Sequence, residues 1–408
     1  MEENRSVDGP LLTASVGAES RALRTCMYTA EAQRGHARYT RDLLSALSQA
    51  GARRSVAVEL VTSRDIDPSY RTPLYPIHAI LPPLLNSSHF HTTAGWAASR
   101  VAHYLRRERI FLDWIAARKG LDLVHFQEYT PWLAPVHFAR LRRRGLGLVA
   151  TVHNVANFGH SSRSYMRVSQ RCWKSGWRQC SALVVHTEGL RATLADFLGP
   201  GHPPIFVVRH AVWEERALPP APAEPPRVGE PSRLLFFGMI RPNKGLHVLL
   251  RSLKRLPDCR LTVVGEPEGQ RYFEDVRALA AALPEGQVEI VSQFVAESEI
   301  AGFFDRAHLV ALPYTEFAAQ SGVLQQAVAH GRPVVATDVG GLGESVRDWG
   351  IGAVVAAGDE AALAAGITRM LRPDAYRAAA LATTRVRDEH TWTEMAEATL
   401  DVYRTVAG

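Results

Sequence analysis

The sequence alternates short apolar runs with longer amphipathic stretches, and a proline-rich segment interrupts this alternation once before it begins again. Such alternation is typical of parallel strands joined by crossover helices, so the chain is predicted to be an α/β protein. The interruption, Pro-Pro-Ala-Pro-Ala-Glu-Pro-Pro-Arg-Val-Gly-Glu-Pro, lies between Leu218 and Ser232. Repeated proline removes backbone donors and disfavours both helix and central strand. We therefore expect a linker over 216–232 between two Rossmann-like domains with parallel sheets.

The two patterns predict the elements of each domain. At 408 residues the chain is too long for one ordinary core. The N-terminal domain is expected over 23–215, after a loose extension over 1–22, and the C-terminal domain over 233–390. A last helical pattern over 391–408 is expected to join the N-terminal domain. The predicted strands lie at 25–29, 56–62, 123–126, 148–152, 182–186 and 205–209, then at 234–237, 260–264, 288–290, 309–312 and 333–337.

Composition excludes several classes of protein. The chain has 46% hydrophobic and 22% charged residues, as a folded globular protein does. The formal charge of +6 comes from scattered residues, which does not indicate a nucleic-acid partner. A basic cleft would suit an anionic small molecule and a basic face would suit anionic lipid headgroups, although each basic run is first interpreted as solvated surface. The four cysteines lack a metal-ligand spacing, and no signal peptide or apolar membrane span is evident. A cytoplasmic protein is predicted, with contact to the inner face of the membrane left open.

One loop of the C-terminal domain carries the features of a diphosphate site. Phe-Phe-Gly-Met-Ile-Arg-Pro-Asn-Lys-Gly-Leu runs from a strand through Gly238 to the cations Arg241 and Lys244, and then into a helix. Glycine allows backbone to approach a ligand, and a helix N-terminus beside two cations favours a phosphate. The alternative is a plain turn with solvated cations.

A second loop of this domain leads through small residues into a helix. Its candidate donor-binding residues are Gln320, Ser321, Gly322 and Val323, whose successive amides could bind an anion or sugar hydroxyls. A helix cap at Ser321 is the alternative, and it is compatible with binding. The glycine pair at 340–341 is a weaker candidate, because such pairs are often only turns.

The N-terminal domain has polar residues where its strands end. His153 and Asn154 follow the strand at 148–152, at the edge that binds ligands in open parallel sheets. A lone histidine at a strand end is often structural, but here it would face the second domain. The Gly35-His36 loop, Glu128 and His210 are weaker candidates of the same kind. Possible contacts of the acceptor or the sugar are His36, Glu128, Asn154 and, in the other domain, Glu316.

Taken in order, these segments resemble the retaining GT-B glycosyltransferases of family four. The series is the glycine at Gly35, Thr-Val-His ending at His153, Val-Val-His-Thr at 184–187, Arg-His ending at His210, Phe-Phe-Gly through Lys-Gly, and Gly-Arg-Pro-Val-Val-Ala-Thr-Asp-Val-Gly-Gly at 331–341. The resemblance covers the chain from about Arg24 to Val406. It implies a GT-B fold in which two domains face each other across a central cleft.

The resemblance also assigns roles to matching residues. It implies that Lys244 binds the donor diphosphate, that His153 lies beside the transferred sugar, and that Gly35 approaches the diphosphate. Backbone amides before Val323 would hold sugar and phosphates. Transfer would then be front-face, with the leaving phosphate helping to deprotonate the acceptor, and no metal or permanently bound cofactor would be needed.

The chain departs from the family pattern at three positions. The family's arginine after the glycine is replaced by Met239, so Arg241 would have to serve. The family's two glutamates, eight residues apart, fall on Ala318 and Gln326. One branch of the family shares Gln-Ser-Gly-Val at this loop. Glu316 is displaced from the position of the first glutamate, and Gln326 could still bind a ribose hydroxyl.

The expected function is transfer of a sugar from a UDP- or GDP-sugar to an acceptor, in bacterial glycan or natural-product biosynthesis. The irregular segments 63–100 and 157–178 are expected to select the acceptor, which could be a polysaccharide, a lipid-linked chain or a small natural product. Two rival functions stay open. One is a non-catalytic protein that binds nucleotide sugars, and the other is an epimerase or phosphorylase on the same fold.

Overall fold

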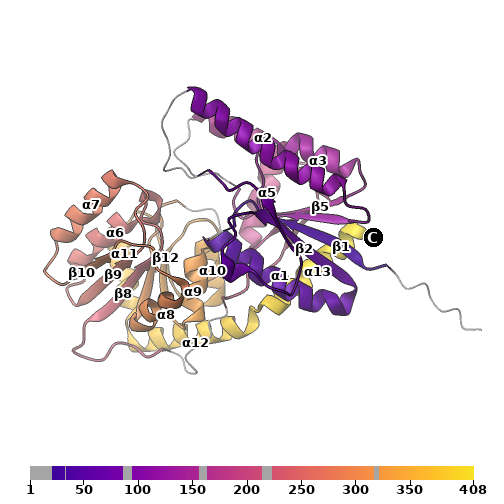
Figure 1. The fold of residues 1–408 in the computed structure, drawn as a ribbon. Helices are drawn as coiled ribbons and strands as arrows, with labels where there is room; N and C mark the ends of the chain where they lie inside the picture. Colours follow the sequence, from indigo (N-terminus) through magenta and orange to yellow (C-terminus); the bar gives the residue numbers. More distant parts are fainter. Residues whose placement is uncertain (1–20, 33, 86–93, 156–162, 214–222, 317–320) are drawn as a thin grey trace, which may run out of the picture.

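The computed structural model describes residues 21–32, 34–85, 94–155, 163–213, 223–316 and 321–408. These residues form two domains, each a parallel sheet flanked by helices (Figure 1). The sheets have the strand orders β3-β2-β1-β4-β5-β6-β7 and β10-β9-β8-β11-β12-β13. The predicted α/β class and the two Rossmann-like domains are confirmed.

The N-terminal sheet is covered by helices on both faces. Its strands are β1 (Leu23–Tyr28), β2 (Val56–Ser63), β3 (Ile77–Leu81), β4 (Leu123–Phe126), β5 (Gly147–Thr151), β6 (Ala182–Val185) and β7 (Ile205–Val207). Its helices are α1 (Arg34–Arg54), α2 (Ala94–Ala116), α3 (Ala134–Arg142), α4 (Arg163–Trp177) and α5 (Glu188–Leu198). Strand β4 is buried at every position, which matches its uninterrupted apolar pattern.

Two segments that were expected to be irregular contain regular elements. The edge strand β3 and the start of α2 lie within 63–100, and most of 157–178 forms α4. Strand β3 is only half-buried, and His78 interrupts its apolar residues, so its pattern is weak. Helix α2 has a weak amphipathic pattern, whereas α4 is clearly amphipathic and could have been predicted from the sequence.

The C-terminal sheet is built in the same way. Its strands are β8 (Ser232–Phe237), β9 (Cys259–Val264), β10 (Val288–Val291), β11 (Leu309–Leu312), β12 (Val334–Thr337) and β13 (Gly352–Val355). Its helices are α6 (Leu246–Ser252), α7 (Gln270–Ala281), α8 (Glu297–Arg306), α9 (Gly322–Ala329), α10 (Gly340–Trp349), α11 (Glu360–Met370) and α12 (Pro373–Glu389). The glycine pair at 340–341 lies in the first turn of α10. None of the helices in the described part of the chain is long and apolar enough to cross a membrane.

The last helix, α13 (Trp392–Ala407), returns to the N-terminal domain. Helix α12 runs along the C-terminal domain, and α13 continues across to pack beside α1 (Figure 1). A capping box formed by Thr391 and Glu394 starts α13. Tyr403 is fully buried, and its hydroxyl lies 2.7 Å from Nδ1 of His125 on β4. The C-terminus of the chain therefore contributes to the core of its first domain.

We predict that Tyr403→Phe lowers the free energy of unfolding by about 1–3 kcal/mol, because it leaves a buried ring nitrogen of His125 without a partner. Chemical denaturation would measure this change. The matched control is Thr405→Val, which removes an exposed hydroxyl of the same helix that bonds only to the Asp401 carbonyl. Equal effects of the two substitutions would contradict the prediction.

Candidate active site

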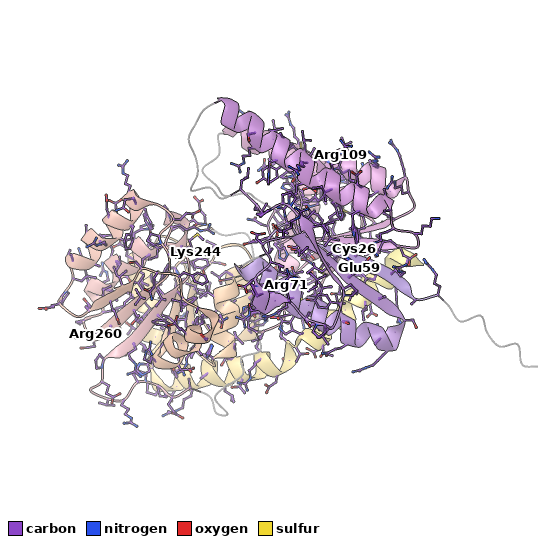
Figure 2. All side chains as sticks on the ribbon, viewed as in Figure 1. Cys26, Glu59, Arg71, Arg109, Lys244 and Arg260 are labelled. Atoms are coloured by element: carbon purple, nitrogen blue, oxygen red, sulfur yellow. The ribbon has the colours of Figure 1, made fainter. Side chains whose placement is uncertain are left out.

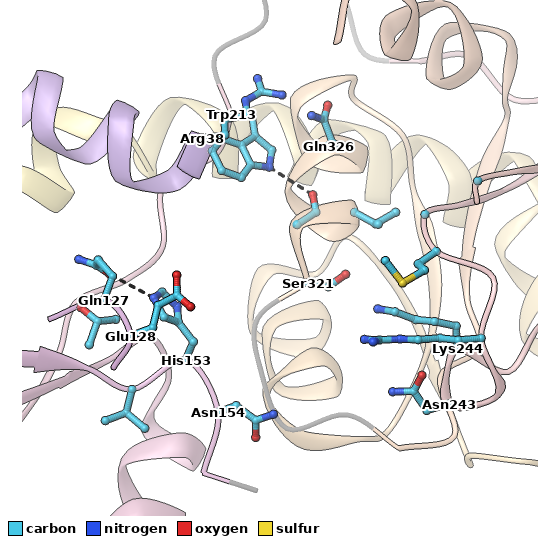
Figure 3. Close-up of a pocket in the computed structure, with 18 of the residues that line it drawn as sticks. Arg38, Gln127, Glu128, His153, Asn154, Trp213, Asn243, Lys244, Ser321 and Gln326 are labelled. Carbon is cyan, nitrogen blue, oxygen red and sulfur yellow. Dashed lines mark hydrogen bonds between the residues drawn. The ribbon is translucent and has the colours of Figure 1, made fainter. Parts of the chain in front are cut away.

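A cavity of about 850 Å³ lies between the two domains, where strands of both sheets end. All strands of each sheet are parallel, so each sheet has one edge at which all its strands reach their carboxyl ends, and these edges bind ligands in open α/β sheets. Figure 3 shows His153 and Glu128 on one wall of the cavity and Lys244 and Asn243 on the opposite wall. We refer to these as the N-terminal and C-terminal walls.

The C-terminal wall carries two cations on the loop after β8. Arg241 and Lys244 both line the cavity, and Lys244 lies on the side of its domain that faces the N-terminal domain (Figure 2). The Lys244 ammonium lies 3.7 Å from the centroid of the Tyr314 ring. The Arg241 guanidinium lies 3.6 Å from the carboxylate of Glu268. The aromatic ring and the carboxylate keep both cations at the cavity.

A close backbone contact holds this loop against the end of β11. Gly245 has φ of +67°, and a Cβ there would lie 1.8 Å from the carbonyl oxygen of Pro313. The Thr315 amide donates to the Asn243 carbonyl at 3.0 Å. Only glycine fits at position 245, so the glycine after Lys244 has a steric reason.

Tyr314 also connects this loop with the start of α9. Its hydroxyl lies 3.0 Å from the Ser321 hydroxyl. Ser321 caps α9, accepting a hydrogen bond from the Leu324 amide. Gly322 and Val323 begin the helix and line the cavity. The positive end of the α9 dipole therefore meets the same space as Arg241 and Lys244.

Gln326 lies one turn further along α9 and also lines the cavity. Its side chain is buried, and its amide oxygen accepts no hydrogen bond from the described residues. A buried carbonyl oxygen of this kind is costly unless a ligand or water satisfies it.

The N-terminal wall presents a hydrogen-bonded histidine. His153 follows β5, and its Nε2 donates to the amide oxygen of Gln127 at 3.1 Å. Tyr39 packs edge-on against the His153 ring, with centroids 5.0 Å apart. The imidazole is thus held in one orientation beside Asn154, which also lines the cavity.

Glu128, which follows β4, adds a carboxylate to this wall. Its Oε1 accepts hydrogen bonds from the Thr29 hydroxyl and the Glu31 amide, both at 3.1 Å. These donors, from the end of β1, hold the carboxylate at the cavity (Figure 3).

Two further histidines lie behind His153 in the core. Burial lowers the pKa of His125 to about 3 and that of His186 to about 4, so both are neutral at pH 7. Nδ1 of His186 donates to the Val208 carbonyl at 2.8 Å. His210 contacts the rings of Tyr39 and Trp213 and does not line the cavity. These residues support the wall, and His153 alone among them reaches the cavity.

The two walls are joined by direct contacts. Nε1 of Trp213 donates to the Gly322 carbonyl at 3.2 Å, and the Arg38 guanidinium stacks on the Trp213 ring at 4.6 Å (Figure 3). Elsewhere between the domains, the Gly189 amide donates to the carboxylate of Glu344 at 3.0 and 3.1 Å. The cavity is therefore closed on one side by contacts between the domains.

Known proteins resemble both halves of the chain. The profile of Glycosyltransferase Family 4 matches residues 33–216, and that of Glycosyl transferases group 1 matches residues 231–373. The D-inositol 3-phosphate glycosyltransferase of Kineococcus radiotolerans is 31% identical over 319 residues, which cover 71% of this chain and 72% of that protein. The chain belongs to the group 1 glycosyl transferases.

Other members of the group and solved structures agree with this assignment. The glycogen synthase of Mycobacterium tuberculosis is 29% identical over 303 residues, covering 71% of this chain and 67% of that protein. Sucrose-phosphate synthase from Thermosynechococcus elongatus has the same fold, with a TM-score of 0.72 at 19% identity over 94% of this chain and 99% of that one. Anabaena HepE, solved in complex with UDP and glucose, has a TM-score of 0.65 at 17% identity, covering 94% and 100% of the two chains. The GT-B architecture is thereby confirmed.

The cavity of this glycosyl transferase brings together most of the residues singled out in the sequence. His153, Asn154 and Glu128 lie on the N-terminal wall. The C-terminal wall holds Gly238, Arg241, Lys244, Ser321, Gly322, Val323 and Gln326. Met239 also lines the cavity. Among the described residues, no cluster of His, Cys, Asp or Glu could hold a metal ion.

Five further residues singled out in the sequence are not placed at the cavity. Gly35 and His36 lie in the first turn of α1, where a loop was expected, because the helix begins at Arg34. Glu316 is exposed and does not line the cavity, although its carbonyl accepts a hydrogen bond from Asn243 at 3.4 Å. Gln320 and Ala318 lie outside the described residues.

Sequence reasoning missed several cavity residues. Gln127, Arg38 and Trp213 all line the cavity, and Trp173 does so from α4. Gln127 is the first polar residue after β4. The rule that ligands bind where parallel strands end, which pointed to His153, could therefore have pointed to Gln127 as well. The others lie on helices or between domains, where no local pattern marks them.

We predict that Gly245→Ala destabilises the protein by about 3 kcal/mol, from a left-handed backbone and a clash with Pro313. Gly358→Ala is the matched control, since Gly358 has φ of +76° with no atom near the added Cβ. That control should cost only about 1–2 kcal/mol. Thermal and chemical unfolding would measure both, and similar losses would refute a steric role for Gly245.

We also predict that stability falls as pH falls from about 6.5 to about 4. His186 is neutral in the folded state and titrates near its ordinary pKa when unfolded, so protons bind the unfolded chain first. The contribution of neutral His186 to the free energy of unfolding is fully present above about pH 6.5, and it is lost as the pH falls towards 4. His186→Asn should flatten this dependence by up to about 1.4 kcal/mol per pH unit. Denaturation at pH 7, 6 and 5 tests it, and an unchanged slope would contradict it.

Proposed function

We propose that this glycosyl transferase moves a sugar from a nucleotide-diphosphate sugar, UDP- or GDP-linked, to an acceptor with retention of anomeric configuration. The observation that carries the proposal is the convergence of Arg241, Lys244 and the start of α9 on one wall of the cavity. Two cations and a helix N-terminus favour a diphosphate by charge, hydrogen bonds and dipole. The UDP and glucose in HepE support a nucleotide-sugar donor here.

In the proposed mechanism, the bond between the anomeric carbon and the leaving phosphate breaks while the acceptor hydroxyl approaches from the same face. Negative charge grows on the leaving phosphate, and Arg241, Lys244 and the α9 amides stabilise it there. A phosphate oxygen takes the proton of the acceptor hydroxyl. His153, held by Gln127, positions the sugar on the opposite wall.

Retention by a double displacement would need a carboxylate nucleophile close to an acid. Among the described lining residues the acids are Glu128 and Glu266, one on each domain. Glu128 already accepts two hydrogen bonds through Oε1. This distribution supports front-face transfer.

Gln326 supports a role in binding the nucleotide. Its buried amide oxygen has no partner among the described residues, so we propose that it accepts a hydrogen bond from a ribose hydroxyl. The family's glutamate at this position could do the same, and the amide retains that capacity.

The favoured biological role is biosynthesis of a bacterial glycan or natural product, by a protein that works in the cytoplasm. The names of the relatives support the biosynthetic role, since they include a glycogen synthase and inositol phosphate glycosyltransferases.

Lys244→Ala is predicted to lower turnover of the donor by about 10²–10³-fold, because one stabilising group for the leaving phosphate is lost. Purified protein would be incubated with UDP-, GDP-, ADP- and dTDP-sugars, with nucleotide release followed by mass spectrometry. Lys254→Ala, an exposed lysine of the same domain, is the control and should retain full activity.

The outcomes of this assay separate the rival functions. Release of one nucleotide that Lys244→Ala loses supports transfer, and the anomeric configuration of a product, read by NMR, tests retention. Binding of a nucleotide sugar without turnover would favour a non-catalytic protein, which the changes at Met239 and Gln326 would then explain. Isomerised sugar without acceptor would indicate an epimerase. No binding at all would overturn the diphosphate site.

A further inference from the structure

The N-terminal wall differs in character from the wall that carries the cations. Besides His153 and Glu128, the aromatic residues Tyr129, Trp173 and Trp177 line it. These side chains come from the loop after β4 and from α4. If the donor's phosphates lie against Arg241 and Lys244, this aromatic wall is left for the acceptor.

Trp173 forms a fixed platform on this wall. Its ring stacks on Trp177, with centroids 4.9 Å apart and planes at 17°. Trp177 is buried, and it packs against Phe197 of α5 with centroids 6.0 Å apart. Trp173 is only partly buried and reaches the cavity. One of its faces is thus supported from behind, which suits stacking against a flat ligand surface.

Glu128 supplies the polar complement of this platform. The Thr29 hydroxyl and the Glu31 amide both donate to Oε1, which holds the carboxylate at the cavity. A carboxylate accepts hydrogen bonds from hydroxyl groups and repels phosphate. Asn154 adds an amide that can both donate and accept.

The cations of the cavity lie elsewhere. Among the described lining residues they are Arg241 and Lys244 on the C-terminal wall, and Arg38, which stacks on Trp213 at the contact between the domains. A phosphorylated acceptor on the aromatic wall would meet a carboxylate there. A pyranose has one apolar face for stacking and a rim of hydroxyls for hydrogen bonding, so it matches both features.

Resting on the proposed function, we propose that the acceptor is an uncharged glycoside. A pyranose ring stacks on Trp173 and its hydroxyls bond to Glu128 and Asn154. This distinguishes the chain from its relative in Kineococcus radiotolerans, whose name specifies a phosphorylated inositol. Glu128 and Trp173 are then specificity residues for the acceptor and take no part in binding the donor phosphates.

The test compares acceptors with the donor that the turnover assay identifies. A panel of neutral mono- and oligosaccharide glycosides is set against inositol 3-phosphate and glucose 6-phosphate. We expect kcat/KM for the best neutral acceptor to exceed that for either phosphate at least about tenfold. Two outcomes would overturn the proposal. One is transfer of the sugar to a phosphorylated acceptor in preference to the neutral glycosides, and the other is donor turnover without transfer to any neutral glycoside.

Substitutions at Trp173 and at Glu128 test the role of each residue in acceptor binding separately. Trp173→Ala should raise KM for the neutral acceptor about tenfold, and Trp173→Phe should restore most of the affinity. Val168→Ala, which shortens an exposed side chain of the same helix, is the control. Glu128→Gln keeps the acceptor atom for Thr29 and Glu31 but removes the charge. It should therefore lower the preference for neutral over phosphorylated acceptors, and an unchanged preference would overturn the role of Glu128.

A binding experiment separates this proposal from the proposed function. Saturation-transfer NMR titrations of the neutral glycoside, with UDP present, would give an affinity about tenfold weaker for Trp173→Ala than for the wild-type protein. If no nucleotide sugar is turned over but this pattern appears, the transferase mechanism fails and the glycoside site stands. If nucleotide sugars are turned over but Trp173→Ala binds the glycoside as well as wild type, the glycoside site fails alone.

Discussion

The cavity exists because two separate sheets are held with their carboxyl edges facing each other. Helix α13 supplies much of this constraint, since it leaves the C-terminal domain and buries Tyr403 against His125 in the first sheet. The Val212 amide donates to the His390 carbonyl where the chain crosses, at 2.8 Å. Each sheet edge alone would be an open surface. Together they enclose a space large enough for a ligand of drug size.

Within that arrangement, one buried side chain organises the phosphate wall. Tyr314 lies two residues after β11. Its ring lies under the Lys244 ammonium, and its hydroxyl lies 3.0 Å from that of Ser321. The Thr337 hydroxyl donates to the Tyr314 carbonyl at 2.6 Å, which ties the residue to β12. The loop after β8 and the start of α9 are therefore positioned by the same group, although they lie far apart in the sequence.

Much of this arrangement could be predicted from the sequence, because parallel strands have strong apolar patterns and place their following residues at one edge. That logic located Lys244, His153 and Ser321 near a common site. It failed at the half-exposed β3, whose apolar pattern is weak. It also overlooked α4, although that helix is clearly amphipathic. It also could not find Trp213, whose role arises only when the domains meet.

The departures from the family pattern gain a physical meaning from this geometry. Met239 lines the cavity where the family has a cation, yet the loop turns so that Arg241 lines it too. The backbone at Arg241 is extended, with φ of −147° and ψ of 158°, and Pro242 then begins a single 3-10 turn that ends with Lys244. In an extended strand, residues two apart point the same way, so a shift of two positions keeps a side chain on the same face. Met239 and Arg241 therefore line the same cavity, and we propose that Arg241 takes the part that the sequence resemblance assigns to an arginine at position 239.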